Sequence, residues 1–186
     1  MIRVAFLDRQ PAVRAGLHAT LRAQPGFASV GSAATARELL VLAYRTDPDV
    51  IVLDDLRLAR RVRIESPRAR VLLYSAVVTP ELVLAATIAN VDGVVDKTAD
   101  TDALLDAVRA VVAGERVLPE VGPRQRSRAA SRLDPRDRPI FAMRLAGTSP
   151  REIAAVVGLG VAALNARIQA IVAQLVPATA AAAQPA

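Results

Sequence analysis

The sequence has 186 residues, 53% of them hydrophobic and 3% aromatic, and a formal net charge of +6. The absence of cysteine excludes a disulfide framework and thiolate metal sites, and the single histidine, His18, excludes most zinc sites. The apolar run at the beginning is too short for a secretory signal. A membrane span needs about 18 consecutive apolar residues, and no segment approaches that length. We therefore expect a cytoplasmic protein with no membrane partner.

The first 115 residues alternate short apolar runs with amphipathic segments. Short apolar runs predict strands at 3–7, 27–31, 49–53, 69–75 and 93–96, and the strand at 27–31 is the weaker one. Apolar residues at helical spacing predict helices at 11–24, 35–46, 79–90 and 101–114. Between the third and fourth strands there is room for only a short helix. This alternation predicts an α/β fold with a five-stranded parallel sheet and helices on both faces.

The remaining residues predict a linker and a small helical domain. Residues 116–131 are rich in proline and arginine and lack periodicity, which is typical of a linker. Residues 132–177 contain three helical segments, and the turn before the last one holds Gly158 and Gly160. A helix, a short turn and a second helix at this spacing predict a helix-turn-helix domain. The alanine-rich residues 178–186 are expected to be a disordered tail.

The positive charge is confined to the last part of the chain. Residues 1–115 carry 14 basic and 14 acidic side chains, whereas residues 116–186 carry 10 basic and 4 acidic ones. This asymmetry favours a polyanionic partner such as nucleic acid. A solvated arginine-rich linker would have the same composition, so that interpretation stays open.

Polar residues stand at the ends of four predicted strands: Asp8, Asp54, Ser75 and Lys97. The carboxyl ends of parallel strands form the ligand-binding edge of an open α/β sheet. Two carboxylates at this edge could hold Mg²⁺, and Lys97, the one lysine of the sequence, could neutralise a phosphoryl group. A single aspartate after a strand is often a turn former or helix cap, so only the combination predicts a site.

Several segments resemble those of a known family. The segments VAFLDRQPAVRAGL, PDVIVLDD, VLLYSA and GVVDKT resemble the signatures of the receiver domain of two-component response regulators. The segment LDPRDRPIFAMRLAGTSPREIAAVVGL resembles the start of a LuxR-type helix-turn-helix. Together they resemble response regulators of the NarL/FixJ class. The resemblance implies a flavodoxin-like (βα)5 receiver domain at 1–115, with a shortened third helix, and a LuxR-type DNA-binding domain at 132–177.

The resemblance also implies roles for the residues at the strand ends. Asp54 corresponds to the phosphoacceptor of a phosphorelay, Ser75 to the hydroxyl switch residue and Lys97 to the invariant lysine. Asp8 and Asp54 correspond to metal ligands, with magnesium as the cofactor. A histidine kinase or another phosphodonor would then be a partner.

The receiver-like part departs from the family's pattern. Arg9 stands where the family has a second acidic residue, and its guanidinium could occupy the magnesium position or pair with Asp54. The loop after Asp54 is altered, and Val94 replaces the aromatic switch residue. We therefore predict an atypical receiver that does not depend on phosphotransfer, and magnesium binding stays open.

The last predicted helix and the one before it hold candidate DNA contacts. Asn165 suits adenine and Arg167 suits guanine, while Arg151 could contact phosphate. The last helix is also rich in alanine, so a packing or dimer helix is an alternative.

These features predict a homodimeric DNA-binding regulator of transcription with a receiver-like domain. The alternative is a pseudo-receiver that binds a protein partner and no longer reads DNA. An enzyme, such as a magnesium phosphatase with Asp54 as nucleophile, is not expected, because Leu56 occupies the position of the second acid that such chemistry needs.

Overall fold

The computed structural model describes residues 1–176, so the predicted tail at 178–186 lies outside the described residues. The chain packs as two units. One comprises Met1–Val77 and Val91–Leu118, and the other comprises Val78–Asn90 together with residues 119–176. The first unit is built on a β-sheet, and the described part of the second is helical.

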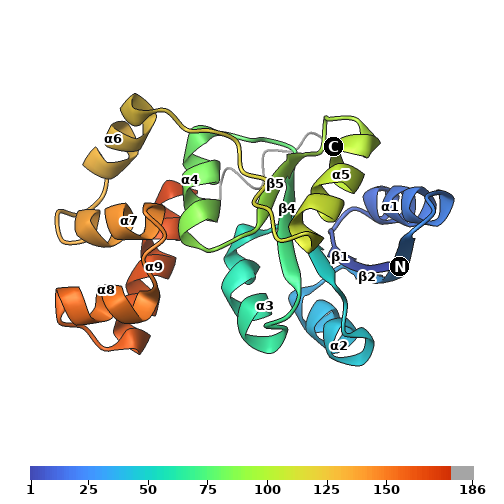
Figure 1. The fold of residues 1–186 in the computed structure, drawn as a ribbon, viewed down its shortest axis with the longest axis horizontal. Coiled ribbons are helices and arrows are strands. Elements are labelled where there is room, and N and C mark those ends of the chain that lie inside the picture. The colour runs from blue at the N-terminus through green and yellow to red at the C-terminus, as the bar shows by residue number, and fades with distance from the viewer. Residues whose placement is uncertain (177–186) are drawn as a thin grey trace. The chain divides into compact units, whose positions relative to one another are not determined.

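The first unit has a five-stranded parallel sheet in the order β2-β1-β3-β4-β5 (Figure 1). Its strands are β1 (Ile2–Leu7), β2 (Phe27–Ala33), β3 (Val50–Leu53), β4 (Arg70–Ser75) and β5 (Gly93–Asp96). Strand β3 is fully buried, as expected for a continuous apolar run in the centre of a parallel sheet. The predicted flavodoxin-like fold is confirmed.

The register of the strands sets the positions of the polar residues that follow them. Strand β1 pairs with β3 up to Leu7 opposite Leu53, so Asp8 and Asp54 are the next residues of two neighbouring strands. Strand β4 pairs with β5 up to Ser75 opposite Asp96, and Lys97 follows. The sheet therefore delivers all the predicted strand-end residues to one edge.

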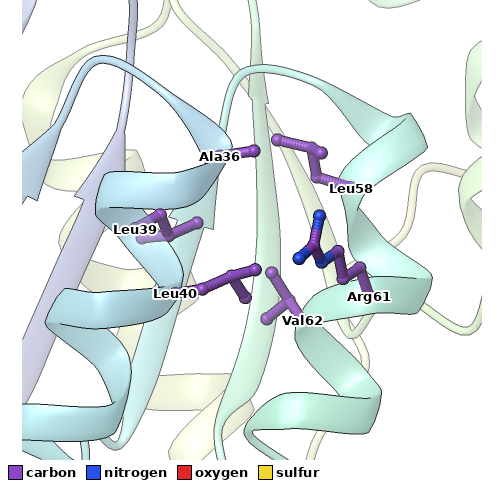
Figure 2. Close-up of a pocket in the computed structure, with 6 residues that line it drawn as sticks. All are labelled: Ala36, Leu39, Leu40, Leu58, Arg61 and Val62. Atoms are coloured by element: carbon purple, nitrogen blue, oxygen red, sulfur yellow. The ribbon is translucent and has the colours of Figure 1, made fainter.

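Helices α1 (Pro11–Ala23) and α5 (Thr101–Val112) cover one face of the sheet, where their apolar side chains share a core with alternate residues of the strands. Helices α2 (Ala36–Thr46) and α3 (Ala59–Glu65) pack on the other face. Figure 2 shows a small apolar pocket between α2 and the α3 region, lined by Ala36, Leu39, Leu40, Leu58, Arg61 and Val62.

The third helix is short, as predicted: α3 has 7 residues and follows the 3-10 turn η1 (Leu56–Leu58). It is tied to the sheet through Asp92, whose side chain is 12% exposed. Asp92 Oδ2 accepts hydrogen bonds from the Arg63 guanidinium and, at 2.7 Å, from the N–H of Val71. This contact stabilises a crossover that has few residues of its own to bury.

The second unit contains α4 (Pro80–Ile88), α6 (Pro123–Ser131), α7 (Arg138–Leu145), α8 (Pro150–Val157) and α9 (Val161–Leu175). Helix α4, which the chain inserts between β4 and β5, contacts α6, α7 and α9 (Figure 1). The buried Arg144 of α7 donates from Nη2 to the carbonyl of Ile88 at 3.0 Å and from Nη1 to that of Thr148 at 2.8 Å. A cation near the last carbonyls of α4 also complements the dipole of that helix.

The prediction of a linker at 116–131 is wrong for Pro123–Ser131, which forms α6. Pro123 occupies the first helical position, and the side chain of Gln125 accepts the N–H of Gly122 at 2.7 Å. Ala129 is the one residue of α6 that is fully buried. The arginine-rich composition hid this helix because it leaves almost no apolar periodicity.

Helices α8 and α9 form the predicted helix-turn-helix. They meet at 102°, within the range of about 90–120° for this motif. Ser149 and Glu152 form the capping box of α8, and Gly158 ends the helix in the left-handed conformation. Within residues 1–176 no single helix is long and apolar enough to cross a membrane, although α8 and α9 taken together would pass by length and composition.

Candidate functional site

The edge formed by the strand ends brings two of the predicted residues into direct contact. Asp8 is 2% exposed, and its Oδ2 forms an ion pair with Nζ of Lys97. Its Oδ1 accepts the N–H of Gln10 at 2.8 Å. Both carboxylate oxygens of Asp8 therefore already have a donor.

Asp54 lies next to this ion pair. Its Oδ2 accepts the backbone N–H of Arg9 at 3.2 Å, whereas Oδ1 is buried and has no hydrogen-bond partner among the described residues. Burial raises the pKa of the Asp54 carboxyl, and the neighbouring charges of Asp8 and Asp55 act in the same direction. The Arg9 N–H and the charge of Lys97 oppose this rise in pKa without cancelling it.

The contact between Arg9 and Asp54 is made by the main chain. The sequence suggested a guanidinium–carboxylate pair, but the Arg9 side chain is exposed, and the ion pairs within residues 1–176 do not include one from Arg9 to Asp54. The pocket gains a hydrogen-bond donor from Arg9 in a way that any residue with a backbone N–H could supply.

Ser75 lies at the same edge, but its hydroxyl faces the loop that follows β4. Its Oγ donates to the carbonyl of Val77 at 2.9 Å and accepts the N–H of that residue at 3.3 Å. The connection from Ser75 to Lys97 is through the backbone, where the N–H of Lys97 donates to the carbonyl of Ser75 at 2.8 Å. The structure thus groups Asp8, Asp54 and Lys97 and turns the hydroxyl of Ser75 aside.

Two residues of the pocket were missed in the sequence. Nζ of Lys97 lies 5.6 Å from the ring centroid of Tyr74, close enough for a cation–π contact. The Arg14 guanidinium donates to the carbonyls of Asp8 at 2.8 Å and Arg9 at 3.1 Å. The position of Arg14 one turn into the helix after Asp8 was the available signal, because that position faces back toward the strand end.

The predicted DNA contacts lie on α8 and α9. Arg151 is exposed near the start of α8, and Asn165 is half-buried on α9. Arg167 of α9 is engaged within its own unit, since its Nε donates to Oδ1 of Asp137 at 2.7 Å. The side chain of Asp137 is 12% exposed and that of Arg167 is 34% exposed.

Residues 4–109 match the family described as the response regulator receiver domain. This match spans more than half of the sequence and includes Asp8, Asp54, Ser75 and Lys97. The chain belongs to the response regulator family.

Relatives extend the similarity into the helical unit. The response regulator protein VraR of Staphylococcus aureus is 28% identical over 188 residues, which cover 94% of this chain and 90% of VraR. A two-component response regulator of the LuxR family from an Aurantimonas species is 26% identical with a TM-score of 0.58, covering 78% of this chain and 95% of that one. These relatives support a response regulator of the NarL/FixJ class.

A solved structure of RcsB from Salmonella enterica serovar Typhimurium shows the same fold. It has a TM-score of 0.61 at 19% identity and covers 94% of this chain and 91% of RcsB. That protein was solved bound to promoter DNA in the presence of the phosphomimetic BeF3⁻.

The magnesium ion that the receiver family implies does not fit this pocket. The candidate ligands are Asp8 and Asp54. Both oxygens of Asp8 already accept N–H donors, whereas Asp54 has one oxygen, Oδ1, without a donor among the described residues. Arg9 replaces the adjacent acid with a cation, and within residues 1–176 no group of three or more acidic or histidine side chains could hold a metal. A divalent cation prefers a site richer in carboxylate oxygens than this one.

Proposed function

We propose that this response regulator is a homodimeric DNA-binding regulator of transcription, rather than an enzyme, and that its receiver domain acts without phosphorylation of Asp54. The proposal that the receiver domain acts without phosphorylation depends on one observation, namely that both carboxylate oxygens of Asp8 already have donors. Its carboxylate is paired with Lys97 and hydrogen-bonded to the chain, in a pocket where Arg9 replaces the second acid.

The charge of the pocket supports this proposal. Lys97 already pairs with Asp8, and the exposed side chain of Arg9 places a positive charge beside the pocket where the family has a second acid, so less electrostatic attraction remains for a divalent cation. Phosphoryl transfer relies on positioned cations to neutralise the transferred group.

The surface of the helical unit supports DNA binding. Seven exposed arginines belong to this unit, and their guanidinium groups can bind phosphates through charge-assisted hydrogen bonds without reading sequence: Arg124, Arg126, Arg128, Arg132, Arg136, Arg138 and Arg151. RcsB, which shares the fold, was solved bound to promoter DNA and as two dimers on two parallel DNAs. A dimer of this chain would place two helix-turn-helix motifs about 34 Å apart, on half-sites one turn of DNA apart.

The alternative function is a protein-interaction module. Exposed apolar side chains on both sides of the turn favour it, with Val156 of α8 72% exposed and Val161 of α9 43% exposed, because an apolar patch suits a protein partner. The two functions differ in whether any DNA is bound.

Phosphorylation is tested by intact mass spectrometry after incubation with Mg²⁺ and acetyl phosphate. We expect no gain of a phosphoryl group. A gain that disappears in Asp54→Asn would contradict the proposal for the receiver domain.

DNA binding is tested by fluorescence anisotropy with a labelled duplex at several salt concentrations. We expect the logarithm of the association constant to fall linearly with the logarithm of salt, and the slope to become shallower by about one unit in Arg151→Gln. Arg22→Gln on α1 is the matched control, because it removes an exposed arginine from the other unit. Undetectable binding to every duplex would favour the protein-interaction module.

A further inference from the structure

The first two turns of α9 expose a face with almost no polar groups. Val161 is 43% exposed, and Ala162, Ala163 and Ala166 are also exposed. Leu164 and Ile168 are buried on the opposite side and fix the orientation of the helix. The outward face of the helix that would enter the major groove is therefore made of methyl groups.

The one charged side chain of α9 is Arg167, and it is committed to another residue. The carboxylate of Asp137 lies at the beginning of α7 and is largely buried. Moving Arg167 to a guanine would leave that buried carboxylate without its charged partner, which is costly. Arg167 thus acts as a positioning residue that holds α9 against α7.

Asn165 is then the polar side chain left to read a base from these turns. An amide presents one donor group and one acceptor, which match N7 and the N6 amino group of adenine in the major groove. Apolar side chains such as alanine contact the C5 methyl group of thymine. Both kinds of contact select the same base pair.

We propose that α9 reads A·T base pairs, with Asn165 recognising adenine and the exposed alanine face packing on thymine methyl groups. This inference rests on the proposed DNA-binding function and specifies its ligand: duplex half-sites rich in A·T pairs, with Arg167 in a structural role.

The experiment begins by selecting binding sites from a random duplex library with the full-length protein. Single thymines in the selected site are then replaced by deoxyuridine, which removes only the methyl group. We expect A·T pairs in both half-sites, and a loss of about fourfold in affinity for each contacted thymine that is replaced. This measurement needs no protein variant, so folding defects cannot affect it.

Variants assign the contacts to residues. Asn165→Ala is expected to lower the preference for adenine at one position of each half-site by about fivefold or more, with affinity for an unrelated duplex unchanged. Gln169→Ala, which removes an amide one turn further along α9, is the matched control and should keep the preference.

Arg167→Ala is expected to weaken binding to the selected and the unrelated duplex by the same factor, and Arg167→Lys, which keeps a cation for Asp137, should restore much of it. If Arg167 only positions α9 and contacts no base, its removal leaves the base preference intact. Loss of a guanine preference in Arg167→Ala would overturn the inference.

The remaining outcomes separate the inference from the proposed function. A selected site dominated by G·C pairs, or deoxyuridine without effect at every position, would overturn the inference while DNA binding stands. Failure to bind any duplex would overturn both, and the apolar face of α9 would then be assigned to a protein partner.

Discussion

Asp54 is held by unequal contacts on its two carboxylate oxygens. One accepts the N–H of Arg9, and the other is buried without a hydrogen-bond partner among the described residues. A buried acceptor in this state costs about 1–3 kcal/mol. The native state therefore disfavours the ionised form of Asp54, in agreement with its raised pKa.

Replacing Asp54 with asparagine should stabilise the protein at neutral pH. The amide oxygen keeps the acceptor for Arg9, the NH2 group takes the place of the oxygen without a partner, and the buried negative charge is removed. We expect this loss of charge to give a net gain of about 1 kcal/mol, or roughly 2–4 °C in Tm. Because the pKa of Asp54 is raised in the native state, ionisation favours the unfolded state once the pH exceeds the ordinary value of 3.8. The gain should therefore be present at pH 7 and fade as the pH falls toward 3.8 and below. Thermal melts followed by circular dichroism across this range test it, and a destabilised variant at pH 7 would contradict it.

We expect the charge of the side chain at position 9 to control whether a cation binds in the pocket. In Arg9→Asp the cation is replaced by an acid beside Asp8, and the formal charge of the pocket changes by two units. We expect Mg²⁺ to leave the Tm of the natural protein unchanged and to raise that of Arg9→Asp in a concentration-dependent way.

Arg9→Ala is the control for this prediction, since it removes the positive charge without supplying a ligand. An equal response of Arg9→Ala and Arg9→Asp to Mg²⁺ would show that charge alone, and not a missing carboxylate, limits binding. The measurement is a thermal shift titration with Ca²⁺ as a second cation.

At the scale of secondary-structure elements, α4 combines a single charged residue, Glu81, with six buried apolar ones within nine residues. A helix that is apolar all round must be covered on all sides. Within the second unit it contacts α7 and α9, and the Arg144 guanidinium binds the carbonyl of Ile88 in its last turn. Arg144 thus joins two elements that lie far apart in the sequence.

Removing the guanidinium of Arg144 should weaken this unit. Arg144→Met keeps much of the apolar stem but leaves the carbonyls of Ile88 and Thr148 without this donor. We expect a loss of about 2 kcal/mol in the free energy of unfolding, the range for hydrogen bonds to charged groups. Urea denaturation measures it, with the exposed Arg136→Gln as a control that should change stability by less than about 0.5 kcal/mol.

The elements that the sequence predicted well are those whose periodicity is set by burial. Strands β3 and β5 have the expected bounds within about a residue, because a parallel sheet demands continuous apolar runs. Helix α1 does so because Pro11 marks its first turn. Helix α6 was missed because only Ala129 needs to be buried. The sequence suggested that Asp54 would contact the guanidinium of Arg9, whereas the structure shows a contact with its backbone N–H. The direction of a backbone N–H depends on loop geometry, which residue types do not encode.

At the scale of the whole molecule, the units defined by packing are not continuous in sequence. Residues 78–90 belong to the helical unit, although the chain on either side of them belongs to the sheet unit. Prediction from sequence assigned this helix to the receiver-like domain because neighbours in the chain usually share a core. The all-round apolar character of α4 was the available signal.

A fragment limited to residues 119–186 should therefore fold poorly. It lacks α4, so apolar side chains of α7 and α9 that contact this helix would be exposed to water. We expect a lower Tm than for the same fragment with residues 78–90 fused through a flexible glycine-serine linker, together with stronger binding of a hydrophobic dye. Equal melting of the two fragments would contradict the assignment of α4.

The membership of α4 also limits how this regulator can be recombined with others. Consider a chimera in which residues 1–118 come from another response regulator and the rest from this chain. Its α7 and α9 would lose their own α4 and would have to pack on the α4 of the other protein. We expect a working graft of the helical unit to include α4, or to need matching substitutions in the α4 of the recipient.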